Sequence, residues 1–374
     1  MVVKPIDSMK VKTQKVTFDG VLNLESGKSL SGFELMTETY GELNQERTNA
    51  VLVCHAFSGN HHAAGSKEGE EKPGWWDELV GDDKTIDTKN YFVVSLNNIG
   101  GCHGSSGPTS ISPESGQPFG ASFPEISVSD WVETQKLLAD HLGIKCWEMV
   151  AGGSLGGMQA LQWAISYPKK INKAAIIAAS SKISTQNIAL NEVAREMIKK
   201  DENFHNGDYL AKGVSPSKGL KAARMLGHIT YLSESNMSKR FGRKLQDPQT
   251  KMDADVNYEV ENYLQYKGEQ FAKTFDANSY ILMTKAMDGF DPAKDFDHDL
   301  VECLKSTQTK LLIASFDSDW LFPKEYGLDM QMSAIKAGID SSYIELDGDY
   351  GHDSFLFYSN QYSAALKNFL NSNE

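Results

Sequence analysis

Apolar and polar positions follow two different periods over the first half of the chain. Runs rich in β-branched residues that end in polar or glycine-rich segments predict strands. These strands are expected over 11–18, 33–40, 50–55, 91–96, 147–151 and 173–179. Helical spacing of apolar residues predicts helices over 129–142, with a serine available as cap, and over 158–167, which Pro168 ends. Strands and helices alternating in this order favour a mostly parallel sheet with helices on both faces.

The alternation stops after Thr185 and returns near Lys310. Between them the apolar spacing predicts helices over 187–201, 218–232, 256–267 and 279–288, with charged stretches and few β-branched runs. Two more strands are then expected over 310–315 and 342–346, with a helix between them and a closing helix over 358–370. The pattern predicts one α/β catalytic core, residues 1–185 and 301–374. A helical lid insertion, residues 186–300, would lie between its sixth and seventh major strands.

Charge and composition narrow the possible partners. The net charge of −13 disfavours nucleic acid and anionic membranes as partners. No apolar run is long enough to span a bilayer, and the N-terminus has no secretory apolar region, so a cytoplasmic protein is expected. The four cysteines are far apart in the sequence, which argues against a zinc site or a disulfide framework; they are Cys54, Cys102, Cys146 and Cys303.

Ser154 is the candidate nucleophile. It stands in the run Gly-Gly-Ser-Leu-Gly, residues 152–156, between the predicted strand 147–151 and an apolar helix expected to begin near Gly157. A strand–turn–helix of this kind lifts a serine hydroxyl out of the sheet, and the glycines prevent clashes in the turn. The alternative is a glycine-rich turn that only packs closely. The context favours an α/β-hydrolase-fold enzyme that works through a covalent acyl-serine intermediate.

A serine nucleophile needs a base and an acid, which in this fold follow it in the order acid, then histidine. Asp317 and Asp319 both follow the predicted strand 310–315, and these residues alone leave the acid open between them. His352 follows the last predicted strand and is the candidate base. His298 lies in an acidic stretch that is expected to form an exposed loop.

An oxyanion hole requires two backbone N–H groups. We expect them from Leu155, which follows the nucleophile, and from Phe57, in the loop after the strand 50–55. His55 is expected to shape that loop. A metal site at His55, His61 and His62 is disfavoured because no acidic or cysteine partner stands at ligand spacing, so no metal is predicted.

Several longer runs point to one family. Together they resemble the α/β-hydrolase-type homoserine O-acyltransferases, over nearly the whole chain. The runs are Cys-His-Ala-Phe-Ser-Gly (54–59), Pro-Gly-Trp-Trp-Asp (73–77), Asn-Asn-Ile-Gly-Gly-Cys-His-Gly-Ser-Ser-Gly-Pro (97–108), Gly-Gly-Ser-Leu-Gly-Gly-Met-Gln-Ala-Leu-Gln-Trp (152–163), Ala-Arg-Met-Leu-Gly-His-Ile-Thr-Tyr-Leu-Ser (223–233), Phe-Asp-Ala-Asn-Ser-Tyr (275–280), Ser-Asp-Trp-Leu-Phe-Pro (318–323) and Gly-His-Asp-Ser-Phe-Leu (351–356). The resemblance implies acetyl transfer from acetyl-CoA to L-homoserine in methionine biosynthesis, with acetyl-CoA as a co-substrate, no bound cofactor and a homodimer.

The resemblance also implies roles for single residues. It gives the triad as Ser154, Asp319 and His352, and so favours Asp319 over Asp317. For the acceptor, it implies that Arg224 binds the carboxylate of the amino acid, Asp353 its ammonium group, and Tyr231 helps to hold it. This agrees with the chemistry, because a zwitterion needs one fixed cation and one fixed anion, and the planar guanidinium suits a carboxylate.

The acyl group is predicted from the residue after the Asp-Trp pair. Leu321 is apolar and cannot pair with the terminal carboxylate of a succinyl group, which favours acetyl. His103 is more similar to the succinyl-transferring members, where other members often have lysine. Two further departures are Phe57 in place of the usual leucine and Thr274 in place of the usual arginine.

Other functions stay open from the sequence. A homoserine O-succinyltransferase, a serine O-acyltransferase and a serine esterase would all use the same nucleophile. A non-catalytic binding protein on a hydrolase scaffold is a further alternative, which the intact order of serine, acid and histidine disfavours.

Overall fold

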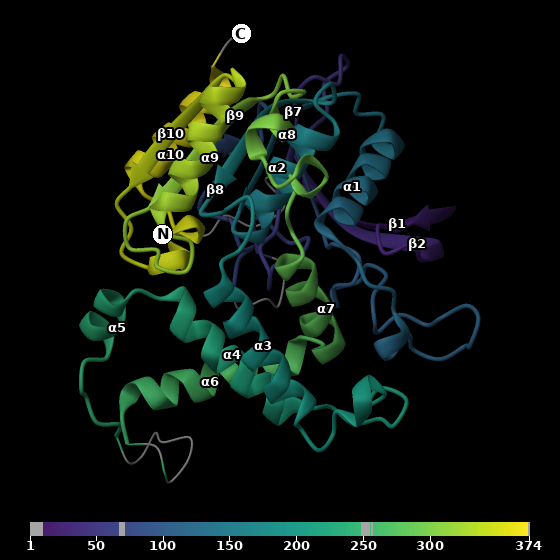
Figure 1. Cartoon of the computed structure of the whole chain (residues 1–374), viewed down its shortest axis with the longest axis vertical. Coiled ribbons are helices and arrows are strands. Elements are labelled where there is room, and N and C mark those ends of the chain that lie inside the picture. The colour runs from purple at the N-terminus through teal and green to yellow at the C-terminus, as the bar shows by residue number, and fades with distance from the viewer. Residues whose placement is uncertain (1–9, 67–71, 248–254, 256, 373–374) are drawn as a thin grey trace.

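An eight-stranded sheet forms the centre of the protein, whose computed structural model describes residues 10–66, 72–247, 255 and 257–372 (Figure 1). The strand order is β1-β2-β6-β3-β7-β8-β9-β10. Its strands are β1 (Lys12–Asn23), β2 (Ser29–Tyr40), β3 (Ala50–Cys54), β6 (Phe92–Leu96), β7 (Trp147–Gly153), β8 (Ile171–Ile177), β9 (Lys310–Phe316) and β10 (Ser341–Leu346). A separate short pair, β4 (Val80–Gly81) and β5 (Ile86–Asp87), was not predicted.

The pairing confirms a mostly parallel sheet. All strands from β6 to β10 in the sheet order pair in parallel, whereas β1 and β2 form an antiparallel hairpin and β2 pairs antiparallel with β6. An antiparallel hairpin needs only a short connection, and residues 24–28 supply it, while each parallel step requires a longer crossover.

Both faces of the sheet are covered, because β3 sends alternate side chains into two separate cores. Leu52 lies in the larger core with α1 and α2, and Val51 lies in the smaller core with α10 and the segment around Trp76. The helices of this part are α1 (Val128–Leu142), α2 (Leu155–Ser166), α8 (Leu300–Leu304), α9 (Lys324–Ala337) and α10 (Asn360–Asn371). None of the helices in the described ranges is long and apolar enough to cross a membrane.

Five of the helices between β8 and β9 gather beyond one end of the sheet (Figure 1). Side-chain caps fix the starts of three of them, because Ser184 accepts from the amide of Asn187, Ser233 from the amide of Asn236 and Asp276 from the amide of Ser279. The five are α3 (Thr185–Lys199), α4 (Ser217–Tyr231), α5 (Glu234–Arg240), α6 (Glu259–Thr274) and α7 (Ala277–Asp288). Val256, where the sequence predicted α6 to begin, lies outside the described residues.

The parallel strands place the functional loops together. β3 ends just before Phe57, β7 just before Ser154, β9 shortly before Asp319, and β10 shortly before His352. Because the carboxyl ends of parallel strands meet at one edge of a sheet, loops that are far apart in sequence converge there.

Candidate active site

Ser154 occupies a strained turn between β7 and α2. Its φ of 57° and ψ of −125° lie outside the regions that side-chain-bearing residues usually adopt. The turn is tight on both sides: a Cβ on Gly152 would lie 2.5 Å from the carbonyl carbon of Gly156, and one on Gly156 would lie 2.1 Å from the carbonyl oxygen of Cys54. The helix begins at Leu155, directly after the serine, so the expected start near Gly157 was wrong by two residues.

Ser154, His352 and Asp319 form one hydrogen-bonded relay. The Oγ of Ser154 lies 2.7 Å from Nε2 of His352, and Nδ1 of His352 lies 2.7 Å from Oδ2 of Asp319. All three side chains are buried. The other carboxylate oxygen, Oδ1 of Asp319, accepts from the amides of Leu321 at 3.0 Å and Phe322 at 2.9 Å. This fixes the carboxylate so that it holds Nδ1 of His352 protonated and leaves Nε2 free to accept from the serine hydroxyl.

The electrostatics support a histidine that can take up a proton. Burial acts to lower the pKa of His352, but the charge and hydrogen bond of Asp319, together with Asp353, outweigh it and raise the pKa above its ordinary value. Asp317 does not share this environment. Its side chain is exposed and accepts from the amide of Gly348 at 2.8 Å, so it joins the ends of β9 and β10 instead.

The two amides expected at the oxyanion hole come from the loops beside Ser154. Leu155 is the first residue of α2, so its N–H has no partner within the helix and shares the positive end of the helix dipole. Phe57 lines the same cavity as Ser154, and its ring packs edge-on against Tyr280 of α7, with centroids 4.8 Å apart. Leu155 and Phe57 therefore both lie beside the serine, where the sequence predicts the oxyanion hole.

His55 supports the loop that carries Phe57. Burial lowers the pKa of His55 to about 4, so the ring is neutral. Its Nε2 accepts from the amide of Asn98 at 3.1 Å, and its Nδ1 donates to the carbonyl of Ala56 at 2.7 Å. His298 is exposed and pairs with Asp291 at 2.6 Å. Among the described residues, no group of histidine, cysteine, aspartate or glutamate side chains could hold a metal ion.

A cavity opens above Ser154 between the core loops and the helices α3, α4 and α7. Next to Ser154 and His352, its wall carries the side chain of Leu321. Asn187, at the start of α3, donates to the carbonyl of Leu321 at 3.0 Å and fixes this wall. The remaining apolar lining comes from Leu190, Ala194, Leu226, Met287 and Phe322. A cavity of this composition suits a short apolar acyl chain.

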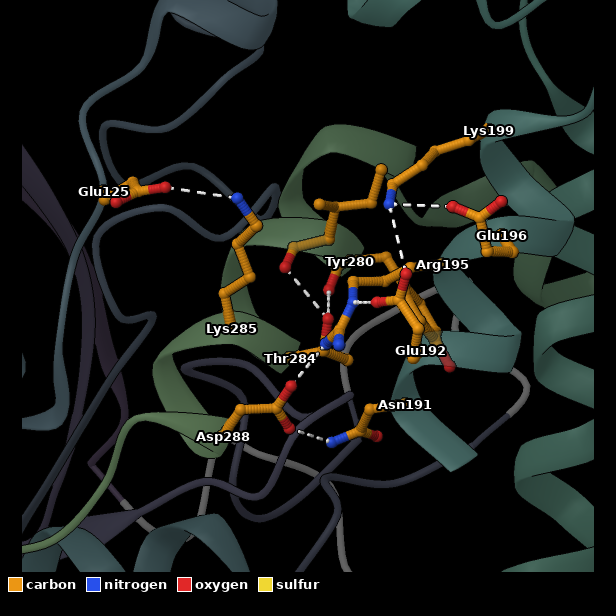
Figure 2. A network of polar contacts seen from close by, with 11 residues as sticks. Glu125, Asn191, Glu192, Arg195, Glu196, Lys199, Tyr280, Thr284, Lys285 and Asp288 are labelled. Atoms are coloured by element: carbon orange, nitrogen blue, oxygen red, sulfur yellow. Dashed lines mark hydrogen bonds and ion pairs between the residues drawn. The ribbon is translucent and has the colours of Figure 1, made fainter. Parts of the chain in front are cut away.

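Behind that lining, α3 and α7 are joined by a buried arginine. Figure 2 shows Arg195 reaching from α3 to Asp288 of α7, with Glu192 on its other side. The guanidinium lies 2.7 Å from Asp288 and 2.8 Å from Glu192, and Asn191 donates to the second oxygen of Asp288 at 2.7 Å. The guanidinium of Arg195 is therefore paired with two carboxylates and joins α3 to α7 in the cavity wall.

Arg224 and Asp353 lie close to Tyr231, whose side chain lines the cavity. Nη1 of Arg224 donates to Oγ of Ser58 at 3.2 Å, and its guanidinium stacks on the ring of Phe271 at 4.6 Å and faces Tyr231 at 5.4 Å. Its Nε is buried and has no hydrogen-bond partner within the described part of the chain. An unsatisfied, half-buried guanidinium is costly and is ready to bind a carboxylate.

Asp353 supplies the opposite charge beside this arginine. Burial raises the pKa of Asp353, and the charges of His352 and Arg224 oppose that rise. The ring of Tyr231 lies 6.3 Å from that of His352. A cation and an anion therefore lie on the same side of the relay, as a zwitterionic acceptor requires.

Some residues of this site gave no signal in the sequence. Ser58 and Asn187 act by single hydrogen bonds that only the folded loops bring about, and the Arg195–Asp288 pair joins residues far apart in the chain. The exposed Thr274 turns its hydroxyl back to α6, 3.4 Å from the carbonyl of Gln270, and makes no contact with the relay.

Comparisons with known proteins agree with this geometry. Residues 49–358 match the model of the alpha/beta hydrolase fold family. A homoserine O-succinyltransferase of Neisseria gonorrhoeae is 51% identical over 363 residues, 97% of this chain and 96% of that protein. The crystal structure of homoserine O-acetyltransferase from Bacillus anthracis superposes with a TM-score of 0.89 at 28% identity, over 97% of this chain and 98% of that one. Esterase E22 superposes with a TM-score of 0.87 at 28% identity, over 96% of this chain and 100% of that one.

Proposed function

We propose a reaction for this chain on the basis of its family. The chain belongs to the homoserine O-acyltransferases of the α/β-hydrolase fold, which are enzymes of methionine biosynthesis. Within that family it transfers the acetyl group of acetyl-CoA to the hydroxyl of L-homoserine, giving O-acetyl-L-homoserine and CoA. The observation that carries the proposal is the buried relay of Ser154, His352 and Asp319, beside which Arg224 of α4 supplies a cation and Asp353 of the core supplies an anion for an amino acid.

The first half-reaction acylates Ser154. His352 takes the proton of the serine hydroxyl at Nε2, and the serine oxygen attacks the thioester carbonyl carbon. The amides of Leu155 and Phe57 stabilise the oxyanion. The carbon–sulfur bond then breaks, and CoA leaves with the proton that His352 had taken, so that acetyl-Ser154 remains with a neutral histidine.

The second half-reaction transfers the acyl group to homoserine. Arg224 binds the acceptor carboxylate, Asp353 binds its ammonium group, and Tyr231 packs beside them. His352 removes the proton of the γ-hydroxyl, whose oxygen attacks the acyl carbon, and the proton finally returns to Ser154. Water competes for the same intermediate. The lid helices α3, α4 and α7 reduce this loss, because they enclose the serine and position the alcohol.

The acyl cavity favours acetyl over succinyl. A succinyl group would place a carboxylate against Leu321, where burial without a partner is unfavourable. Arg195 is engaged by Glu192 and Asp288. Burial lowers the pKa of His103, so this ring is neutral near neutral pH and provides no positive charge.

Succinyl transfer is the second candidate, and the name of the Neisseria relative favours it at 51% identity. The two donors are distinguished by kcat/KM for acetyl-CoA and succinyl-CoA with homoserine as acceptor. We expect a preference for acetyl-CoA of at least about tenfold, which corresponds to roughly 1.4 kcal/mol in the transition state. A preference for succinyl-CoA would overturn the assignment of the acyl group but not of the family.

Hydrolysis and serine acylation are tested in the same assay. CoA release is followed with homoserine, with serine and without an acceptor. The proposal expects release to accelerate strongly with homoserine, and release that is equally fast without it would identify an esterase. Light scattering tests the further prediction of a homodimer, and cell fractionation that of a cytoplasmic enzyme.

A further inference from the structure

Two cations from different helices lie over one aromatic ring above the active site, and a third acts on one of them. Arg240 ends α5 and stacks on the ring of Tyr263 at 4.5 Å, and Nζ of Lys267, one turn along α6, lies 5.7 Å from the same ring. Lys72 is exposed and is the charged residue that most strongly lowers the pKa of Lys267. We call Lys72, Arg240 and Lys267 the cationic rim.

The rim connects to the catalytic histidine through a series of rings. The ring of Tyr263 lies 5.7 Å from that of His228, which lies 6.0 Å from Tyr231, whose ring is 6.3 Å from His352. The hydroxyl of Tyr263 also lies 3.4 Å from Nδ1 of His228. The rim therefore lies at the far end of this row of rings from His352.

Within the described part of the chain, the acidic side chains near the rim are paired with other groups. No described residue forms an ion pair with Lys72, Arg240 or Lys267. The neighbouring acids are engaged elsewhere: Glu269 pairs with Lys221 at 2.8 Å, Asp349 with Lys239 at 3.2 Å, and Glu261 accepts from the amide of Tyr258 at 2.7 Å.

The mutual repulsion of these cations shifts the pKa values of neighbouring groups. Burial lowers the pKa of Lys267, and the charges of Lys72, Arg224 and Arg240 lower it further, while only Asp353 opposes them. Burial also lowers the pKa of His228 to about 3, with Arg224, Lys267 and Arg240 adding to the effect. In a chain with a net charge of −13, this concentration of unpaired cations is energetically unfavourable unless an anion binds.

We propose that the cationic rim binds the phosphate groups of the acyl-CoA donor and thereby holds its thioester over Ser154. The inference rests on the proposed function and assigns donor contacts that the catalytic residues do not provide. A polyphosphorylated donor supplies several negative charges at a distance from its thioester, which matches a rim separated from the serine by three rings. Arginine stacked on an aromatic ring keeps its N–H groups at the edge free for phosphate.

The test compares two donors that share the thioester and differ in phosphate. Wild type and the variant with Arg240→Gln and Lys267→Gln are assayed with acetyl-CoA and with S-acetyl-N-acetylcysteamine, a thioester that carries no phosphate. We expect the KM for acetyl-CoA to rise about tenfold or more, because each lost charge-assisted contact weakens binding several-fold. With the truncated thioester, kcat/KM should change less than about twofold.

Salt and a control variant complete the test. Raising ionic strength should increase the wild-type KM for acetyl-CoA and have a smaller effect on the variant, because the screened charges are gone. Lys336→Gln removes an exposed cation at the end of α9, away from the lid, and should leave both donors unaffected.

Two results would overturn the proposal: an unchanged KM for acetyl-CoA in the double variant, or an equal loss with both thioesters. A wild type that transfers acyl groups from neither thioester would instead refute the proposed function, on which the rim depends.

Discussion

Replacing Asp319 by asparagine changes one group in the relay and reverses its hydrogen bonding. Oδ1 of Asp319 accepts from the amides of Leu321 and Phe322 at 3.0 and 2.9 Å, so the oxygen of an asparagine must remain there. The NH₂ group of that asparagine then takes the place of Oδ2, which in the wild type lies 2.7 Å from Nδ1 of His352. Because that NH₂ can only donate, Nδ1 must accept, and the ring proton moves to Nε2. A protonated Nε2 cannot take the proton of Ser154.

The expected loss follows from this wrong tautomer. A relay of this type loses about 10⁴-fold in kcat when its carboxylate becomes an amide. At about 1.4 kcal/mol for each factor of ten, this is roughly 5 to 6 kcal/mol of lost transition-state stabilisation. The charge of Asp319 also raises the pKa of His352 against the effect of burial. Wild-type kcat/KM should therefore fall as pH decreases through a pKa above the ordinary histidine value, and residual activity of Asp319→Asn should persist to lower pH.

The assay measures CoA release from acetyl-CoA in the presence of homoserine, for Asp319→Asn and for the matched variant Asp317→Asn. Asp317 is exposed and accepts only from the amide of Gly348, so its variant should keep activity within about twofold. Circular dichroism verifies that both variants are folded. The reasoning would be refuted if Asp319→Asn kept more than a tenth of wild-type activity, or if Asp317→Asn lost as much as Asp319→Asn.

Three further changes test other parts of the site. Arg224→Lys should raise the KM for homoserine about tenfold or more and leave acylation by acetyl-CoA unchanged, since an ammonium cannot replace the planar fork; a rapid-quench measurement of each half-reaction checks this, and slowed acylation would contradict it. Leu321→Arg places a cation in the acyl cavity and should increase kcat/KM for succinyl-CoA relative to acetyl-CoA by about tenfold; an unchanged ratio would exclude this wall as the acyl determinant. Gly156→Ala would bring a Cβ within 2.1 Å of the Cys54 carbonyl oxygen and should lower the free energy of unfolding by at least about 1–3 kcal/mol, measured by urea denaturation; wild-type stability would show that the turn can relax.

The sequence predicted the core strands well because their β-branched runs are bounded by polar loops. It placed the ends of β3, β7 and β9 within two residues. The start of α2 was wrong because Gly156 and Gly157 disfavour helix by propensity, whereas the close approach of α2 to β3 requires a glycine at 156. The antiparallel hairpin of β1 and β2 could not be distinguished from parallel strands by apolar spacing alone.

The candidate site likewise has parts that the local sequence predicts and parts that only the folded chain brings together. The strand–turn–helix around Ser154 and the late positions of Asp319 and His352 are features of local sequence, so they could be predicted. The choice between Asp317 and Asp319 depends on which carboxylate receives the amides of the next turn, which only the folded loop decides. The cationic rim joins Lys72, Arg240 and Lys267, and their distance in the sequence hides it from any local pattern.

The central claim, that Ser154 carries the acyl group during transfer, is tested most directly by intact-protein mass spectrometry after brief exposure to acetyl-CoA or succinyl-CoA without homoserine. The account predicts that the wild-type protein gains the mass of one acetyl group, that Ser154→Ala gains none, and that added homoserine removes the group from the wild type. An acyl mass on Ser154→Ala, or no acyl mass on wild type from either donor, would contradict the mechanism.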